Sequence, residues 1–200
     1  RTIGVFWERG VDRGYQFLTF TRLNREWLAA APVEASAGTY QVISKGEAAG
    51  TYQAFPDVCR LKNGDLLCVF YAGYGHVSLP RDDWPRGGRI CSVRSADEGK
   101  TWSAPRLLFD GPLDDRDPHI AQMPDGLVLC SFFTYQPQAE GPARCDTCLV
   151  SSSDGGETWE SEPRVVAPGW PCSAPVRVLP DGIRLLGVYR ENGGTAYGGV

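Results

Sequence analysis

The sequence lacks the surplus of lysine and arginine that is typical of proteins that bind nucleic acid. Its 200 residues carry 20 basic and 24 acidic side chains, which gives a formal net charge of −4. Such a chain has no basic surface that could neutralise phosphates, so we expect no nucleic-acid partner. It also has no run of about 20 apolar residues, the length that a membrane-spanning helix needs, so we expect no membrane span.

The N-terminus lacks the short basic and then apolar pattern of a secretion signal. Because the chain begins with Arg1 rather than Met, a signal could have been removed or never included. The sequence therefore leaves the localisation unknown, with a secreted or periplasmic protein open if a signal has been removed. It does not indicate an oligomeric state either.

A second cysteine pair that could complete a structural zinc site is missing. Cys145 and Cys148 form a C-x-x-C, but such a site needs four ligands and no other pair of suitable spacing follows. The total of 7 cysteines is odd, so they cannot all pair within the chain. We expect no metal and no other cofactor.

What the sequence does contain is an octapeptide that occurs twice, at 95–102 and 152–159. Both copies read S-x-D-x-G-x-T-W, and we call them the box octapeptides. The pattern predicts a hairpin turn, in which Asp accepts hydrogen bonds from turn amides and Gly takes a positive φ. Thr then returns the chain to the strand, and Trp covers the hairpin.

A longer repeat lies upstream of each octapeptide, at 55–71 and 117–133, with a third copy at 174–189. Each copy reads as a strand, an Asn-Gly or Asp-Gly turn and a second strand. The turn glycines are 62 residues apart (64 to 126) and 56 apart (126 to 182), and the box aspartates are 57 apart (97 to 154). One unit is thus four short strands in about sixty residues, the size of a propeller blade.

The repeat predicts an N-terminal segment of unassigned role at 1–38 and a partial β-propeller at 39–200. The expected blades cover about 50–110, 115–168 and, incompletely, 172–200. A strand at 39–45 is assigned to the last blade of the ring. Val200 takes the place of Val93 and Val150 before their boxes, so a third box is expected near position 202. Because a ring must close to cover its strand edges, we expect this chain to be about half of a propeller.

Four cysteines recur at equivalent strand positions. Cys68 and Cys130 each follow a turn glycine by four residues, and Cys91 and Cys148 each precede the first Ser of a box by four. Free cysteine is among the most buried residue types, so we expect these side chains in the core.

The two box octapeptides, each placed between the third and fourth strands of a repeated blade, resemble the Asp boxes (BNR repeats) of the sialidase (neuraminidase) superfamily. The resemblance covers 40–200, and the segment 45–56 is similar to the entry of a sialidase's first blade. It implies an all-β, six-bladed propeller that binds a glycan at the mouth of its central channel. It also implies that the boxes are structural turns, so the functional residues should lie at the ends of the innermost strands and in the loops over the channel.

The chain departs from the family at the first inner strand, where sialidases carry an Arg-Ile-Pro whose Arg pairs with the substrate carboxylate. The matching residues here are Ala54, Phe55 and Pro56. Arg116 at the entrance of the second blade is the candidate for this role, since a guanidinium is the natural receptor for a carboxylate.

The family's general acid comes from the long loop after the second strand of the first blade. That loop runs here from 73 to 88, so the resemblance carries the catalytic acid/base over to Asp82 or Asp83. An adjacent Trp84 and a second carboxylate are surroundings that raise a carboxyl pKa. The alternative is a solvated pair of loop aspartates.

Asp57, His119 and Pro175 occupy equivalent places on the three inner strands, which suggests a position that faces the channel. We expect Asp57, Asp117 and His119 to line the substrate subsite with Arg116. His119 could act as an acid or base, or could simply be satisfied by Asp115 or Asp117.

Two further groups of residues could face the pocket. Arg190 and Glu191 end the second strand of the third blade, although an exposed Arg-Glu pair is usually a weak surface ion pair. Tyr74, His76 and Trp84 could supply an aromatic face on which a sugar stacks.

These residues support three hypotheses about function. The first is a glycoside hydrolase of the exo-α-sialidase type that cleaves terminal sugars from glycans. The second is a propeller polysaccharide lyase, which would use His119 and a Tyr for proton abstraction, and the third is a non-catalytic Asp-box propeller that binds glycan or protein. The family's Tyr nucleophile, its Glu partner and its remaining arginines come from later blades.

Overall fold

The protein is described by a computed structural model, which covers residues 2–9, 17–24, 41–46, 48–192 and 195–200. Every regular element in these ranges is a β-strand, and all pairings are antiparallel. The predicted all-β class is therefore confirmed. Within the same ranges no helix is long and apolar enough to cross a membrane.

The strands form successive sheets in which neighbours along the chain lie side by side. The N-terminal sheet contains β1 (Thr2–Arg9), β2 (Phe17–Asn24) and β3 (Gln41–Lys45). The sheet that we call blade 1 contains β4 (Tyr52–Arg60), β5 (Leu66–Gly73), β6 (Arg89–Ser95) and β7 (Arg106–Phe109). Blade 2 contains β8 (Asp114–Gln122), β9 (Val128–Gln136), β10 (Arg144–Ser152) and β11 (Arg164–Ala167).

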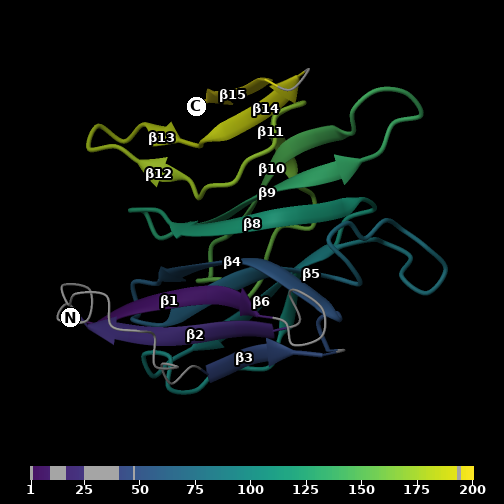
Figure 1. The fold of residues 1–200 in the computed structure, drawn as a ribbon. Coiled ribbons are helices and arrows are strands. Elements are labelled where there is room, and N and C mark those ends of the chain that lie inside the picture. The colour runs from purple at the N-terminus through teal and green to yellow at the C-terminus, as the bar shows by residue number, and fades with distance from the viewer. Residues whose placement is uncertain (1, 10–16, 25–40, 47, 193–194) are drawn as a thin grey trace, which may run out of the picture.

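The last four strands form two short hairpins, which we call blade 3. They are β12 (Arg177–Val178) with β13 (Arg184–Leu185), and β14 (Val188–Asn192) with β15 (Thr195–Gly199). Figure 1 shows the sheets following one another through the molecule, from the N-terminal sheet at the bottom of the view to blade 3 at the top. This is the arrangement of consecutive propeller blades. Closure into a ring of six stays a prediction.

The strand expected at 39–45 is observed as β3, and residues 39 and 40 lie outside the described residues. β3 pairs with β2, with Leu18 opposite Ser44. Strands β1 and β2 come from the segment 1–38, to which we could assign no role, and the rest of that segment also lies outside the described residues. The place of β3 in the last blade of a closed ring stays a prediction.

Two details that the sequence predicted for blade 3 are wrong. The second strand expected near 184–189 is interrupted, since β13 ends at Leu185 and β14 begins at Val188. The ladder pairs Val188 with Gly199, one residue later than the equivalence of Val200 with Val93 and Val150 requires. Val200 is 90% exposed, whereas Val93 and Val150 are buried inside their sheets.

The box octapeptides form the predicted turns. The Asp97 carboxylate accepts hydrogen bonds from the backbone N–H of Lys100 (3.0 Å) and Thr101 (2.8 Å) and from the Thr101 hydroxyl (2.7 Å), and Gly99 has φ +76°. Asp154 makes the same contacts in the second box. The bonds from Thr101 hold the pKa of Asp97 well below its usual range, so this exposed carboxylate stays ionised.

One detail of the predicted turn is wrong. The strand does not resume at the threonine of the box, because Asp97 holds both the backbone and the hydroxyl of Thr101 in the turn. The next strand, β7, begins only at Arg106. The two box tryptophans then do more than cover a hairpin, since Trp102 and Trp159 pack against the clusters that join one sheet to the next.

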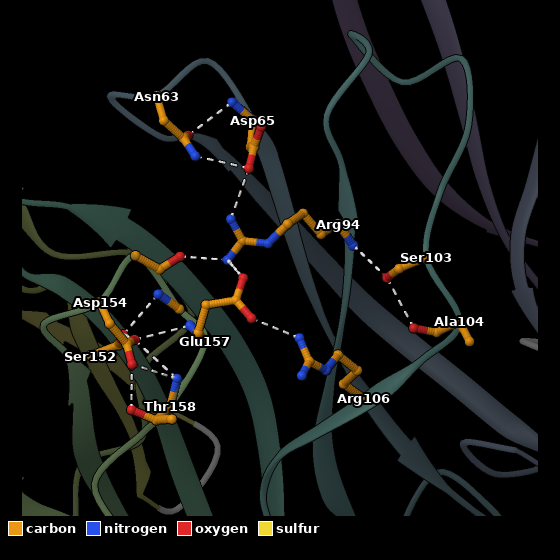
Figure 2. Close-up of polar contacts among 12 residues, drawn as sticks. Asn63, Asp65, Arg94, Ser103, Ala104, Arg106, Ser152, Asp154, Glu157 and Thr158 are labelled. Atoms are coloured by element: carbon orange, nitrogen blue, oxygen red, sulfur yellow. Dashed lines mark hydrogen bonds and ion pairs between the residues drawn. The ribbon is translucent and has the colours of Figure 1, made fainter.

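Arg94 of blade 1 links its own sheet to the box of blade 2, as Figure 2 shows. Its guanidinium contacts the Asp65 carboxylate at 3.0 Å, the Gly155 carbonyl at 2.5 Å and the Glu157 carboxylate at 3.3 Å. Arg106 binds the other oxygen of Glu157 at 2.9 Å. Each of these partly exposed ion pairs stabilises the fold by about 1 kcal/mol or less. Together they hold the second box against blade 1.

The apolar core lies between the blades. Its largest cluster joins Leu67 and Val69 of blade 1 to Ile120, Val128 and Phe132 of blade 2. The four cysteines that we predicted to be buried are buried and free, as expected: Cys68, Cys91, Cys130 and Cys148. Neighbouring blades therefore share one core, and neither blade is an independent unit.

The two glycines of the second box provide a matched test of this packing. Both have positive φ, but a Cβ on Gly156 would lie 2.7 Å from Cδ2 of Leu67, whereas a Cβ on Gly155 meets nothing within 4 Å. The left-handed backbone costs alanine about 1 to 2 kcal/mol at either position, and overpacking adds about 1 to 3 kcal/mol at Gly156 alone. We expect urea denaturation of the full-length protein to show Gly156→Ala as clearly less stable than Gly155→Ala. If both variants lost the same free energy of unfolding, the packing of the second box against Leu67 would be contradicted.

Candidate functional site

The strand directions place two kinds of connection at opposite ends of the blades. The Asn-Gly and Asp-Gly turns and both box octapeptides lie at one end, which we call the box end. The 74–88 and 110–113 connections lie at the other, which we call the loop end, together with the first residues of β4 and β8. Every residue that we proposed for chemistry in blades 1 and 2 belongs to the loop end or to the inner strands below it.

Arg116 is buried where the inner strands of the two blades meet. Only 5% of the residue is exposed. Its guanidinium carbon lies 5.6 to 5.9 Å from the centres of four aromatic rings, which are those of Phe55, Tyr71, Phe133 and Tyr135. Aromatic faces attract a cation at such distances. The Nε atom is buried and has no hydrogen-bond partner among the described residues.

His76, which we had considered as a stacking surface, instead contacts Arg116. Its Nε2 lies 3.2 Å from Nη2 of Arg116, and its Nδ1 lies 3.0 Å from the hydroxyl of Tyr52. A guanidinium can only donate, so Nε2 must accept, and the proton of the neutral ring lies on Nδ1 and is donated to Tyr52. Burial, followed by the charge of Arg116, lowers the pKa of His76 below its usual value, which favours this neutral form.

Asp114 supports the other side of the guanidinium. Its carboxylate lies 3.7 Å from Nη1 of Arg116 and accepts hydrogen bonds from the Tyr71 hydroxyl (2.8 Å) and the Ser78 N–H (3.2 Å). Asp114 is fully buried, and burial raises its pKa even though these partners oppose the shift. The sequence analysis missed Tyr71 and Asp114. The only available signal was that Asp114 stands two residues before Arg116, on the same side of the strand.

Asp57 and His119 form a pair across the two inner strands. Oδ2 of Asp57 lies 3.2 Å from Nδ1 of His119 and accepts a hydrogen bond from the Ile120 N–H at 3.0 Å. The Nε2 atom of His119 is buried and has no hydrogen-bond partner among the described residues. The expectation that Asp115 or Asp117 would satisfy this histidine is wrong, since its partner comes from the neighbouring blade.

Equivalent β-bulges explain how the pair forms. In each inner strand two residues lie opposite one residue of the next strand, between Ala54 and Asp57 in β4 and between Arg116 and His119 in β8. The first residue of each bulge has a positive φ, 55° at Phe55 and 48° at Asp117, a conformation that residues other than glycine rarely adopt. Bulges commonly re-aim a side chain next to a functional site, and here they bring a carboxylate and an imidazole together.

The remaining predicted residues lie around this centre. Asp117 is close enough to Tyr189 of blade 3 for its charge to contribute, after burial, to the raised pKa of that tyrosine. Arg190 is exposed, with its guanidinium 5.8 Å from the ring centre of Trp170. The backbone of Glu191 lies in β14, and its side chain is outside the described residues. The sequence analysis did not single out Tyr189, which lies close enough to Asp117 and Arg116 for both charges to act on its hydroxyl.

Asp82 and Asp83 lie apart from this cluster, on the exposed part of the 74–88 connection. The Asp83 carboxylate pairs with Arg81 at 2.6 Å, and the Arg81 guanidinium lies 3.7 Å from the ring centre of Tyr74. The structure thus joins Arg116 to His76 and Asp57 to His119. It shows no contact of either loop aspartate with these residues in the described part of the chain. The role of Asp82 or Asp83 as an acid/base stays a prediction.

Asp115 is a buried carboxyl beside the site. Its Oδ2 accepts a hydrogen bond from the Gly111 N–H at 2.6 Å, and its Oδ1 has no partner among the described residues. Burial raises the pKa of Asp115 to about 8, and the charges of Asp110 and Asp114 add to the shift against the Gly111 bond. The folded protein therefore holds a proton on Asp115 at neutral pH.

This proton makes stability depend on pH. An unfolded aspartate ionises near pH ~3.9, so between there and about pH 8 the folded state binds one more proton than the unfolded state. The free energy of unfolding should fall as pH rises through this window, by up to about 1.4 kcal/mol per pH unit. Urea denaturation of Asp115→Asn, which keeps a neutral side chain of the same shape, should show a shallower fall, whereas Asp181→Asn at an exposed turn should keep the wild-type slope. An unchanged slope in Asp115→Asn would show that this carboxyl is ionised in the folded protein.

No group of three or more His, Cys, Asp or Glu side chains in the described part of the chain is arranged to hold a metal ion. The polar groups that the described structure brings together at the loop end are the Arg116 guanidinium, the His76 ring, the Asp57–His119 pair and the hydroxyls of Tyr52 and Tyr71.

The structure of this chain is similar to several solved structures. The Hadza microbial sialidase Hz136 superposes with a TM-score of 0.60 at 18% identity, over 92% of this chain and 40% of that one. An endo-arabinase from Bacteroides thetaiotaomicron gives 0.59 at 14% identity, over 98% and 68% of the two chains. A Trypanosoma rangeli sialidase in complex with sialic acid gives 0.57 at 15% identity, over 95% and 32%.

The sequence matches no protein-family model and no curated protein. This chain thus spans less than half the length of the two sialidases, and its similarity to all three proteins lies in structure rather than sequence. Identities of 14 to 18% establish architecture alone. The chain has the fold of the sialidase-type β-propellers.

Proposed function

We propose that this chain is part of a glycoside hydrolase of the exo-sialidase type, which removes a terminal acidic sugar from a glycan. The observation that carries the proposal is the buried Arg116, whose Nε has no partner among the described residues and whose surroundings are aromatic. A buried donor without a partner is costly, and a sugar carboxylate would satisfy it with a charge-assisted hydrogen bond. The fold supports the proposal, because the solved structures that it resembles include sialidases.

Arg116 suits this role although it occupies blade 2. The arginine of the sialidase pattern is replaced by Ala54 in blade 1, and Arg116 stands at the equivalent place in the next blade. Ala54 pairs with Tyr71 in the ladder, just as Arg116 pairs with Phe133. The side chain reaches back to Tyr71 and His76 of blade 1, so the positive charge still lies between the two inner strands.

The Asp57–His119 pair supplies a group that can move a proton. Asp57 holds the imidazole through Nδ1, which directs the second nitrogen, Nε2, to act as acceptor. In a hydrolase this nitrogen would accept or return a proton near the sugar, alongside Asp82 or Asp83 if the loop closes over the substrate. Asp117 borders the same space from the bulge of β8, and Arg190 and Glu191 would border it from blade 3.

The Asp57–His119 pair also favours a second candidate, a polysaccharide lyase. Such an enzyme abstracts the proton next to a uronate carboxylate, and a carboxylate-oriented imidazole beside an arginine could do so. The two candidates leave different products. A hydrolase releases a free sugar, whereas a lyase leaves an unsaturated uronate with a new ultraviolet absorbance.

The test is a screen of the full-length protein against fluorogenic N-acetylneuraminides, other terminal glycosides and uronate polymers. The proposal expects turnover of an acidic glycoside, strongly reduced in His119→Asn. If the protein instead forms an ultraviolet-absorbing product from a uronate polymer and cleaves no glycoside, it is a lyase rather than a hydrolase. Saturable binding of a glycan with no turnover of any substrate would show that the propeller only binds.

A further inference from the structure

His76 lies at the exposed edge of the Arg116 cluster. The histidine is exposed, whereas only 5% of Arg116 is exposed. Its ring stands edge-on to two aromatic rings, with centres 6.2 Å from that of Tyr52 and 5.7 Å from that of Phe55. Because its Nε2 lies 3.2 Å from Nη2 of Arg116, a ligand that binds to this Nη2 must contact the histidine as well.

A tight turn fixes the position of this ring. The Ser78 hydroxyl accepts hydrogen bonds from the backbone N–H of Tyr74 (3.0 Å) and Gly75 (3.2 Å), and it donates to the Gly75 carbonyl at 3.1 Å. The Ser78 N–H donates to the Asp114 carboxylate at 3.2 Å. Asp114, which supports the guanidinium, thus also anchors the turn that carries His76, so the ring and the cation keep their relative positions.

The charges next to the ring nearly balance before any ligand binds. The groups that face His76 are the Tyr52 hydroxyl from β4 and the Arg116 guanidinium from β8. Behind the guanidinium lie the Asp114 carboxylate of β8 and the Tyr71 hydroxyl of β5. Since Arg116 and Asp114 form an ion pair at 3.7 Å, a bound carboxylate would leave one negative charge uncompensated, which is costly away from bulk water.

A proton on His76 supplies the missing positive charge. In the neutral ring the Nε2 lone pair accepts from Arg116, and it would repel a carboxylate that takes a hydrogen bond from the same Nη2. Once Nε2 takes up a proton from solvent, Nη2 of Arg116 and Nε2 of the imidazolium both donate to the carboxylate. The Nδ1–H keeps its hydrogen bond to Tyr52, so the ring does not have to turn.

We propose that His76 is a second ligand for the carboxylate of the acidic sugar, which it binds as an imidazolium, so that binding takes up a proton. This inference rests on the proposed function, because Arg116 must be the carboxylate site. Burial and the charge of Arg116 lower the pKa of His76 before the sugar binds, and a bound anion raises it. The affinity should therefore be highest below the first pKa, fall as pH rises between the two values, and stay constant above the second.

The test is isothermal titration calorimetry of the full-length protein with N-acetylneuraminic acid. Between about pH 5 and pH 8 the affinity should fall about tenfold or more, which corresponds to a pKa shift of about one unit or more. Near pH ~6.5, two buffers with different ionisation enthalpies should give binding enthalpies that differ in the sense of proton uptake. His76→Gln keeps an acceptor for Arg116 and a donor for Tyr52 but cannot take up the proton. It should bind like the wild type near pH ~8 and lose most of the pH dependence.

His119→Gln is the matched control, because it removes the other histidine of this chain and leaves the His76 ring in place. Whatever its absolute affinity, this variant should keep the proton uptake. An affinity of the wild type that does not change with pH, or a proton uptake that persists in His76→Gln, would overturn the role of His76 and leave Arg116 as the carboxylate site. Failure of the wild type to bind the sugar at any pH would overturn both this inference and the proposed acidic-sugar site.

Discussion

Replacing Arg116 by lysine is expected to lower kcat/KM on an acidic glycoside by about 100-fold or more. Lysine keeps the positive charge but cannot present two parallel N–H donors to a carboxylate. A hydrogen bond to a charged group is worth about 1.5 to 3 kcal/mol, and a 100-fold loss corresponds to about 2.7 kcal/mol. The steady-state kinetics of the full-length protein measure this loss, and most of it should appear in KM if Arg116 binds the ground state and the transition state alike.

The control for this variant is Arg164→Lys, which changes an exposed arginine of β11. It should leave kcat and KM unchanged. Thermal unfolding of both variants shows whether Arg116→Lys also lowers stability. A loss of stability is expected if lysine pairs less well with the buried carboxylate of Asp114. Wild-type kinetics in a folded Arg116→Lys would remove Arg116 from the substrate site and with it the proposal of an acidic sugar.

Truncation of Phe132 should have the largest effect on stability. The side chain is fully buried between blades 1 and 2, and its ring centre lies 5.0 Å from that of Phe109. Replacing a buried phenylalanine by alanine costs about 3 to 5 kcal/mol, a large share of the 5 to 15 kcal/mol that stabilises a typical domain. We therefore expect Phe132→Ala to lower the urea midpoint of the full-length protein severely, or to prevent its recovery as soluble protein.

Leu107→Ala is the matched control, because Leu107 belongs to the same blade as Phe109 but is 58% exposed. Its loss should change the free energy of unfolding by about 0.5 kcal/mol or less. Should both variants unfold at the same urea concentration, the two blades would not share a core, and the packing of consecutive sheets would be wrong.

The fold could be predicted from sequence because its strongest signals are local. Gly64 and Gly126 mark the hairpin turns between inner strands, and the box octapeptides mark the outer ones, so four strands per unit follow from spacing alone. The buried cysteines followed from the same register. Blade 3 was predicted less well, because its second strand is interrupted between Leu185 and Val188 and the register of its last hairpin differs by one residue.

The site could be predicted only in part, because its contacts join residues far apart in the chain. Asp57 and His119 are 62 residues apart (57 to 119) and meet only when two inner strands lie side by side. His76 reaches Arg116 from a connection whose path the sequence does not specify. The positive φ angles at Phe55 and Asp117 could not be predicted from sequence, because few residues other than glycine adopt them.

The most direct test of the whole account is a crystal structure of the full-length protein soaked with N-acetylneuraminic acid. The account predicts the sugar at the loop end, with its carboxylate within hydrogen-bond distance of the Arg116 guanidinium and its ring near the Asp57–His119 pair. A sugar bound at the box end, or at the loop end with its carboxylate turned away from Arg116, would contradict it.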